Sequence, residues 1–318
     1  MLAGVLTGNG HDVTVWSFED DVVADINNNH RNSTYLPEYS INTEVKATSD
    51  SSKLNNAEII VQAVPTQYIR PVLSQYDFDF NDKIVVNVAK GIEENSLYRV
   101  SEILDEVVSV QPGNYVVLTG PSHAEEVARQ IPTTVVAASE VHDTAELVQN
   151  VFTTPVFRVY TSEDVIGCEL GGSLKNVIAI AAGIIDGLGL GDNTKAALIT
   201  RGLAEITRLG VVLGANPNTF SGLSGLGDLF VTCSSMHSRN RFVGEQIGRG
   251  RTLQQIQSDM KMVAEGVSTT QSAYALAQRH DVELPIVTQV HRILFEDIKP
   301  ADAIQELMTR QTKREWWW

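Results

Sequence analysis

The chain has 318 residues, of which 43% are hydrophobic and 20% are charged, a composition typical of a soluble globular protein long enough for two domains. Its 39 acidic and 24 basic residues give a formal net charge of −15, which argues against binding to nucleic acid or insertion into a membrane. Two cysteines, Cys168 and Cys233, are too few for a disulfide framework, and residues 1–10 lack the basic start of a signal peptide. We therefore expect a protein of the reducing cytoplasm.

The chain starts with MLAGVLTGNGHDVTVW, which reads as the end of a helix, a stop at Gly10 and a strand. A dinucleotide-binding sheet normally starts with an earlier strand and a G-x-G-x-x-G turn. Neither precedes Gly10, so we expect that the first strand and its phosphate loop are absent from this sequence. We expect this chain to bind a dinucleotide weakly or not at all, and the natural protein to have about 15–20 further N-terminal residues.

Residues 11–161 alternate short apolar runs with helix-like stretches. The runs are residues 11–17, 58–64, 83–90, 115–120, 133–139 and 156–161. Near-continuous apolar strands separated by helices predict a parallel sheet that is covered on both faces. Ligands of such sheets bind at the carboxyl ends of the strands.

After Ser162 the pattern is helical only. Helices are predicted over residues 196–213, 239–248, 252–258, 269–280, 284–294 and 300–308. The expected fold class is therefore an α/β parallel sheet without its first strand, followed by an all-α domain. We place the domains at 1–161 and 162–318, with the boundary near Thr161.

The stretch from residue 162 to 191 forms the central helix of this prediction. From Gly171 to Ile185 every residue is apolar or small except Ser173, Lys175 and Asn176, so the helix should be buried on nearly every face. The unbroken apolar piece after Asn176 is much shorter than the roughly 20 residues that a bilayer needs. Lys175 either reaches the surface along its apolar neighbours, or is desolvated and able to exchange protons near neutral pH.

Two strand ends in the first half carry polar residues. Lys90 precedes Gly91 in AKGIE, where a surface lysine before a turn is at least as plausible as a binding residue. The segment GPSHA, residues 120–124, could hold an anion with its backbone N–H groups and the Ser122 hydroxyl. A plain strand-to-helix turn explains its glycine and proline equally well.

Three further segments lie in the helical half. In SGLSGLGDLFVTC, residues 221–233, Asp228 is the only charged residue and could be functional or simply cap a helix. In SRNR, residues 238–241, the side chains are donors suited to phosphate, although a solvated helix start has the same composition. Glu265 in VAEGV could bind a ribose or nicotinamide, or only favour the positive end of the helix dipole.

These segments, together with AVPTQ, AKGIE, GPSHAEEVA and ELGGSLKNVIAIAAGIIDGLGLGDNTKAALITRGLAEITRLG, closely resemble the bacterial-type NAD(P)-dependent glycerol-3-phosphate dehydrogenases. The resemblance extends from Leu2 to Met308. It implies a Rossmann-like domain followed by a helical substrate domain. It also implies the interconversion of dihydroxyacetone phosphate and sn-glycerol 3-phosphate with NAD(P)H, which supplies glycerophospholipid synthesis, and it is compatible with a homodimer.

The resemblance also implies roles for single residues, with Lys175 as the proton donor and acceptor. It implies substrate contacts at Lys90, Gly120, Ser122, Lys175, Asp228, Ser238, Arg239 and Asn240. It implies cofactor contacts at Phe18, Lys90, Ala124, Arg239, Val263 and Glu265. No metal is expected.

The segment after the second predicted strand bears on the choice of cofactor. Where the family usually has a basic residue or histidine for the 2′-phosphate of NADPH, this chain has Ser17-Phe18-Glu19-Asp20. Acidic residues suit a free ribose 2′-hydroxyl, so we expect NADH to be accepted at least as readily as NADPH.

Two alternatives remain at this stage. One is a related hydroxy-acid or keto-acid reductase with the same two-domain plan, although the phosphate donors of SRNR argue against a substrate without phosphate. The other is a truncated, catalytically silent remnant of the fold.

Overall fold

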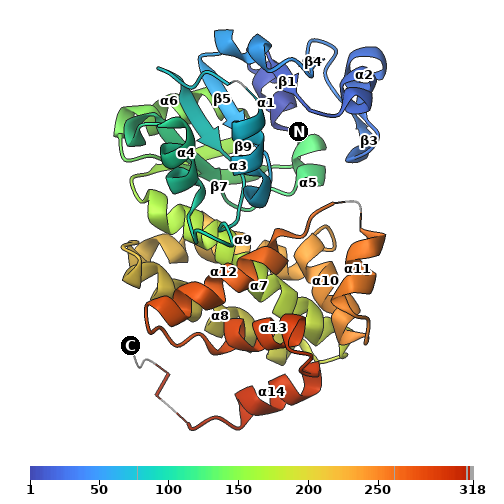
Figure 1. Cartoon of the computed structure of the whole chain (residues 1–318), viewed down its shortest axis with the longest axis vertical. Helices are drawn as coiled ribbons and strands as arrows, with labels where there is room; N and C mark the ends of the chain where they lie inside the picture. The colour runs from blue at the N-terminus through green and yellow to red at the C-terminus, as the bar shows by residue number, and fades with distance from the viewer. Residues whose placement is uncertain (77, 261, 313, 316–318) are drawn as a thin grey trace. The chain divides into compact units, whose positions relative to one another are not determined.

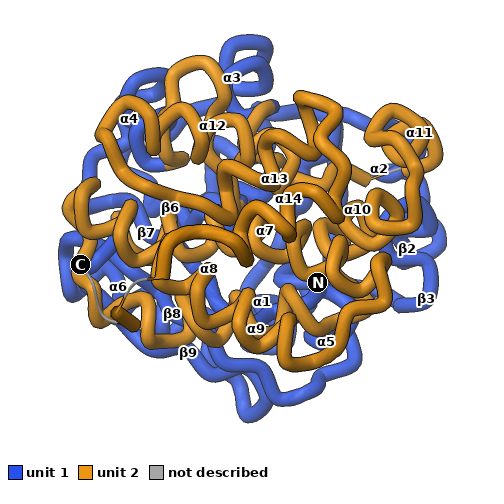
Figure 2. The backbone as a smooth tube through the Cα atoms, turned by 90° about the horizontal axis from the view of Figure 1, so that it is seen from below, with its two compact units in different colours: residues 1–64, 68–89, 101–165 blue, residues 65–67, 90–100, 166–318 orange. Residues whose placement is uncertain are grey.

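The computed structural model describes residues 1–76, 78–260, 262–312, 314 and 315 (Figure 1). Contacts between Cα atoms divide the chain into two units, which Figure 2 draws in different colours. Unit 1 consists of residues 1–64, 68–89 and 101–165, and unit 2 of residues 65–67, 90–100 and 166–318. The short segments 65–67 and 90–100, which follow predicted strands, are thus counted with the helices. A domain boundary near Thr161 remains our proposal.

Unit 1 is built on a five-stranded sheet with the order β5-β6-β7-β8-β9. Its strands are β5 (Ile59–Gln62), β6 (Ile84–Asn87), β7 (Tyr115–Thr119), β8 (Thr133–Ala138) and β9 (Phe157–Ser162). The expectation of a purely parallel sheet is wrong at one pair, because β7 and β8 are antiparallel while the other neighbours are parallel. Between β7 and β8 lies only the short helix α5 (Ala124–Ala128), whereas a parallel crossover needs a longer connection.

Two smaller sheets complete the strands of unit 1. The run predicted over residues 11–17 contains β1 (Thr14–Trp16), which pairs in parallel with β4 (Lys46–Thr48). A hairpin of β2 (Arg31–Asn32) and β3 (Leu36–Ser40) was not predicted, because both strands are short and largely exposed. The other helices are α1 (Leu2–Gly8), α2 (Asp20–Asn29), α3 (Thr66–Gln75), α4 (Val100–Val108) and α6 (His142–Phe152), with 3-10 turns η1 (Ser51–Asn56) and η2 (Pro112–Asn114).

Unit 2 is helical, as predicted. Its helices are α7 (Val165–Gly187), α8 (Asp192–Val212), α9 (Asp228–Ser234), α10 (Arg239–Gly248), α11 (Leu253–Asp259), α12 (Glu265–Arg279), α13 (Pro285–Phe295) and α14 (Pro300–Met308). A 3-10 turn η3 (Pro217–Ser221) and a π-turn η4 (Leu223–Gly227) precede α9. The predicted bounds of α10 and α14 are confirmed, whereas α12 begins four residues earlier than predicted.

Helix α7 is the core element of unit 2, and it runs through the centre of its helices (Figure 1). Every residue from Gly167 to Ile185 is buried, which confirms the predicted all-round burial. By length and composition alone α7 could cross a bilayer, but its apolar window lies entirely inside the protein, as in a core helix. Lys175, at 6% exposure, is therefore held in the protein interior and does not reach the surface.

Candidate active site

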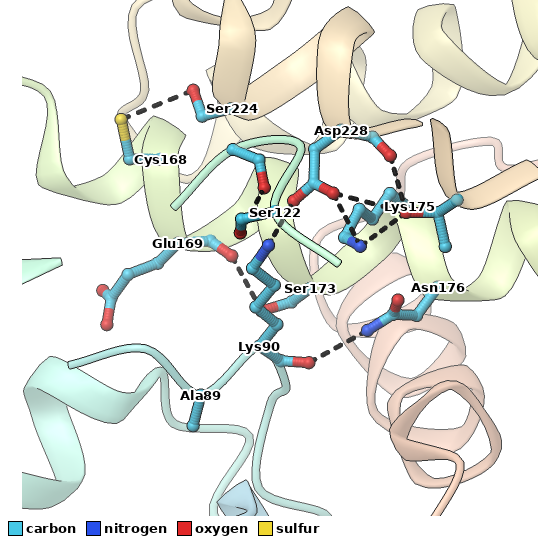
Figure 3. Close-up of polar contacts among 12 residues, drawn as sticks. Ala89, Lys90, Ser122, Cys168, Glu169, Ser173, Lys175, Asn176, Ser224 and Asp228 are labelled. Atoms are coloured by element: carbon cyan, nitrogen blue, oxygen red, sulfur yellow. Dashed lines mark hydrogen bonds and ion pairs between the residues drawn. The ribbon is translucent and has the colours of Figure 1, made fainter. Parts of the chain in front are cut away.

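The centre of the site is a carboxylate that bridges two lysines within unit 2 (Figure 3). Asp228 Oδ1 lies 2.9 Å from Lys175 Nζ, and Asp228 Oδ2 lies 2.6 Å from Lys90 Nζ. The Asp228 side chain is only 2% exposed and that of Lys90 is 19% exposed. Asp228 thus does not act as the helix cap that its position at the start of α9 allowed.

Close packing of glycines brings Asp228 to α7. Gly171 of α7 lies so near the η4 turn that a Cβ atom there would be 2.5 Å from the carbonyl oxygen of Ser224. A Cβ at Gly225 would lie 2.1 Å from the carbonyl oxygen of Phe220. Because no side chain fits at either position, the glycines of SGLSGLGD place the start of α9 directly against α7.

The Lys90 segment is held on the same helix. Ser173 Oγ lies 3.2 Å from the carbonyl oxygen of Gly91 and 2.7 Å from that of Glu169 one turn earlier in α7, and Asn176 Nδ2 donates to the carbonyl oxygen of Lys90 at 3.1 Å. The two polar residues that flank Lys175 in sequence thus orient the loop that carries the second lysine. This explains why the otherwise apolar helix contains them.

Thr232 completes the cluster, and it was not predicted from the sequence. Lys175 Nζ donates to Thr232 Oγ1 at 2.7 Å, and Thr232 Oγ1 lies 2.6 Å from the carbonyl oxygen of Asp228 one turn earlier in α9. The spacing of four residues from Asp228 was the available signal, since such residues share a helix face.

Burial sets the proton affinities of this cluster. Desolvation lowers the pKa of Lys175 to about 8, with Asp228 opposing the shift and Lys90 adding to it. For Asp228, burial alone would raise the pKa, but the ammonium groups of Lys175 and Lys90 outweigh it and lower the pKa below its usual value. The site therefore contains a lysine that exchanges its proton near neutral pH, beside a carboxylate that stays ionised.

A second group of predicted residues lies at the start of α10. Ser238 caps this helix, because its Oγ accepts from the backbone N–H of Arg241 at 3.2 Å. Asn240 Oδ1 accepts from the backbone N–H of Gly266 at 2.9 Å. Arg239 is exposed and, among the described residues, forms no hydrogen bond or ion pair. Its guanidinium is available to an anion at the positive end of the helix dipole.

Glu265 does more than favour the helix dipole. Its Oε1 accepts from the backbone N–H of Thr66 at 2.9 Å and from Thr66 Oγ1 at 3.1 Å. Thr66 is the threonine of the predicted AVPTQ segment and is 1% exposed. Val263, two residues before Glu265, is 37% exposed. Glu265 therefore anchors segment 65–67 to α12 within unit 2.

Four predicted residues belong to unit 1. Gly120 follows β7 and has φ +138°, a conformation that favours glycine, and Ser122 Oγ donates to its carbonyl oxygen at 3.0 Å. Ala124 is the first residue of α5. Phe18 follows β1, and its side chain is 64% exposed.

Each unit, taken by itself, contains side chains whose chemistry suits part of a nicotinamide dinucleotide. Phe18 offers an exposed aromatic face, and Arg239 offers a cation to a phosphate group. The first turn of α2 contains Asp20 and Asp21, which suit a ribose 2′-hydroxyl better than a 2′-phosphate.

Comparison with known proteins identifies the family. Residues 1–145 match the family model described as NAD-dependent glycerol-3-phosphate dehydrogenase N-terminus, and residues 164–305 match the model of its C-terminus. The chain belongs to this family. The glycerol-3-phosphate dehydrogenase family resemblance seen in the sequence motifs is thereby confirmed.

Individual family members match over nearly the whole chain. A glycerol-3-phosphate dehydrogenase (NAD(P)+) of Lysinibacillus sphaericus is 54% identical, covering 99% of this chain and 94% of the relative. The enzyme of that name from Bacillus subtilis is 50% identical and covers 99% and 92%. The crystal structure of glycerol-3-phosphate dehydrogenase from Coxiella burnetii superposes with a TM-score of 0.91 at 39% identity, covering 97% of this chain and 95% of that one.

Proposed function

We propose that this protein interconverts dihydroxyacetone phosphate and sn-glycerol 3-phosphate with NADH or NADPH, and that it thereby supplies glycerophospholipid synthesis. Its relatives are named glycerol-3-phosphate dehydrogenases (NAD(P)+) and match it over 99% of the chain. The observation that carries the chemical proposal is the buried Lys175 in contact with Asp228. Neither a different hydroxy-acid reductase nor a silent remnant is favoured by this similarity.

Reduction of a ketone needs a hydride at carbon and a proton at the developing alkoxide oxygen. A dihydronicotinamide, when bound, would supply the hydride. Lys175 would give its proton to the oxygen and take it back in the reverse reaction, since its pKa of about 8 lies near the working pH. The ionised Asp228 would hold both lysines in place and keep Lys175 partly protonated.

Binding of the substrate phosphate is proposed for the start of α10. Ser238, Arg239 and Asn240 would hold it with the exposed guanidinium and the helix N-terminus. Lys90 would contact both substrate and cofactor, and Gly120 and Ser122 the substrate. Phe18, Ala124, Val263 and Glu265 would contact the cofactor.

The test is the substitution Lys175→Met, with the reaction followed through the absorbance of the reduced nicotinamide. We expect kcat for dihydroxyacetone phosphate reduction to fall by about 10²- to 10⁴-fold, as for loss of a general acid. Lys299→Met, at the N-cap of α14, is the control and should keep the wild-type rate. A Lys175→Met variant that folds and retains the wild-type kcat would show that another group transfers the proton.

Two broader expectations belong to this proposal. The buried, unbridged Cys168 and Cys233 support a reducing compartment, and thus the cytoplasm. Assembly into a homodimer is expected from the family resemblance, and light scattering of the purified protein tests it.

A further inference from the structure

Asp186, at the last turn of α7, is the centre of an ion-pair cluster outside the lysine site. Its Oδ2 lies 2.7 Å from both Nε and Nη2 of Arg241, and its Oδ1 lies 2.5 Å from Nζ of Lys195 at the start of α8. The side chains of Asp186 and Arg241 are only 15% and 12% exposed. Glu245 adds a weaker contact to Arg241 at 3.7 Å.

In this cluster Arg241 has a different binding partner from the phosphate that its sequence context suggests. Arg241 is the last residue of SRNR, and all four side chains of that segment are donors suited to phosphate. In the structure, however, its guanidinium makes two bonds to Asp186 on a neighbouring helix. Arg239 has no such partner among the described residues. The two arginines of the segment therefore differ in what they can do.

Helices α7 and α10 also touch through their backbones. A Cβ atom at Gly183 of α7 would lie 1.9 Å from the carbonyl oxygen of Arg241, and one at Gly244 of α10 would lie 1.9 Å from the carbonyl oxygen of Ile180. Gly187 and Gly248, four residues further along each helix, are in similar contact. With no layer of side chains between them, the two helices have little freedom to tilt or slide.

The two helices carry different parts of the proposed site. Lys175 lies on α7, eleven residues or about three turns before Asp186, and Ser238 to Asn240 form the N-terminus of α10. The glycine contacts set the distance between the helix axes, while the two-point bond from Arg241 to Asp186 lies beside the first turn of α10.

We propose that Arg241 is a positioning residue, which Asp186 holds so that the phosphate-binding turn of α10 keeps its place relative to Lys175. The inference rests on the proposed function for the phosphate contacts. It assigns Arg241 no contact with the substrate. Misplacement of a bound group by about 1 Å can cost about 10²-fold in rate, so a small shift of this turn is measurable.

The experiment compares Asp186→Asn, Arg241→Met and the double variant, with Arg249→Met as control. Arg249 is the C-cap residue of α10, and its exposed guanidinium pairs with Glu245 at the far end of this helix from the phosphate-binding turn. The dissociation constant of glycerol 3-phosphate is measured by calorimetry, and unfolding in urea corrects for any unfolded fraction. We expect each single variant to weaken binding about tenfold or more, the double variant to be no weaker than the singles, and Arg249→Met to bind as the wild type does.

A direct phosphate contact by Arg241 predicts a different result, which would overturn the proposal. Asp186→Asn would then bind glycerol 3-phosphate at least as tightly as the wild type, because it frees the guanidinium. Unchanged binding in Arg241→Met would overturn it as well.

Activity gives a second readout that separates this inference from the proposed function. With dihydroxyacetone, which has no phosphate, kcat/KM should change less than about threefold in the variants, whereas with dihydroxyacetone phosphate it should fall about tenfold or more. Equal losses with both substrates would indicate general damage to the site and refute the positioning role. Failure of the wild type itself to reduce dihydroxyacetone phosphate would instead refute the proposed function, while the binding measurements still decide the role of Arg241.

Discussion

The substitution Asp228→Asn probes the electrostatic balance of the lysine site most directly. It removes the negative charge that lies 2.9 Å from Lys175 Nζ and 2.6 Å from Lys90 Nζ, and it hardly changes the side-chain volume. Lys175 then keeps its burial and its repulsion from Lys90, both of which lower its pKa. The pKa of Lys175 must therefore fall below its wild-type value of about 8.

The size of this fall follows from the distance. With an effective dielectric constant of about 20, two unit charges 2.9 Å apart interact by about 6 kcal/mol, which corresponds to about four pKa units. If the pKa of Lys175 falls by half of this shift, about a tenth of the Lys175 side chains are protonated at pH 7. If it falls by the full shift, about a thousandth are protonated. We therefore expect kcat for ketone reduction at pH 7 to fall between about tenfold and about a thousandfold.

The assay is kcat as a function of pH in both directions. Wild-type reduction should be constant below the pKa of about 8 and fall above it, because it needs the protonated amine. In Asp228→Asn the fall should begin at lower pH, and alcohol oxidation, which needs the neutral amine, should no longer rise towards pH 8. Asp281→Asn, an exposed residue that also loses one negative charge, is the control and should keep the wild-type profile. If kcat for reduction by Asp228→Asn began to fall at the same pH as in the wild type, the reasoning would be refuted.

Three further predictions concern other parts of the chain. Burial raises the pKa of Glu205 from 4.5 to about 7, so between these pH values the folded state binds more protons than the unfolded state. The free energy of unfolding should therefore fall by about 3 kcal/mol as pH rises from 4.5 to about 7. Urea titrations at successive pH values measure this fall, which should be absent in Glu205→Gln. Gly183→Ala should lower the free energy of unfolding by about 3 kcal/mol or more, since its Cβ meets backbone atoms. Gly4→Ala, inside helix α1 with no atom within 4 Å of the added Cβ, should not lower it, and equal urea midpoints for the two variants would contradict the helix contact. For the cofactor, kcat/KM with NADH should be at least that with NADPH, and a clear preference for NADPH would show that the acidic start of α2 does not select the ribose.

The central helix and its lysine could be predicted from the sequence because the information is local. Fifteen residues from Gly171 to Ile185 with three polar exceptions require burial on every face, and the structure has it. The bounds of α10 and α14 could also be predicted from local sequence, since Ser238 is a good N-cap and Pro300 is a good first residue of a helix.

What could not be predicted depends on contacts between distant residues. Lys90 and Asp228 are 138 positions apart, and no local pattern says that they pair. The antiparallel pairing of β8 with β7 depends on how the chain after β7 packs. A run of β-branched residues predicts a strand but not whether it runs parallel or antiparallel to its neighbour. The role of Arg241 was obscured because an arginine that binds phosphate and one that pairs with Asp186 look alike in sequence.

The absence of any exposed face between Gly167 and Ile185 has a consequence for how this enzyme family can vary. A helix that other elements enclose on all sides offers no position where a larger residue can be accommodated outward, so each change there must be matched by a compensating change in a neighbour. Adaptation to new substrates or temperatures is then easiest in the loops and helix ends around α7. A saturation mutagenesis library should show this as a block of intolerant positions along α7, flanked by permissive ones such as the exposed Glu163 and Leu190.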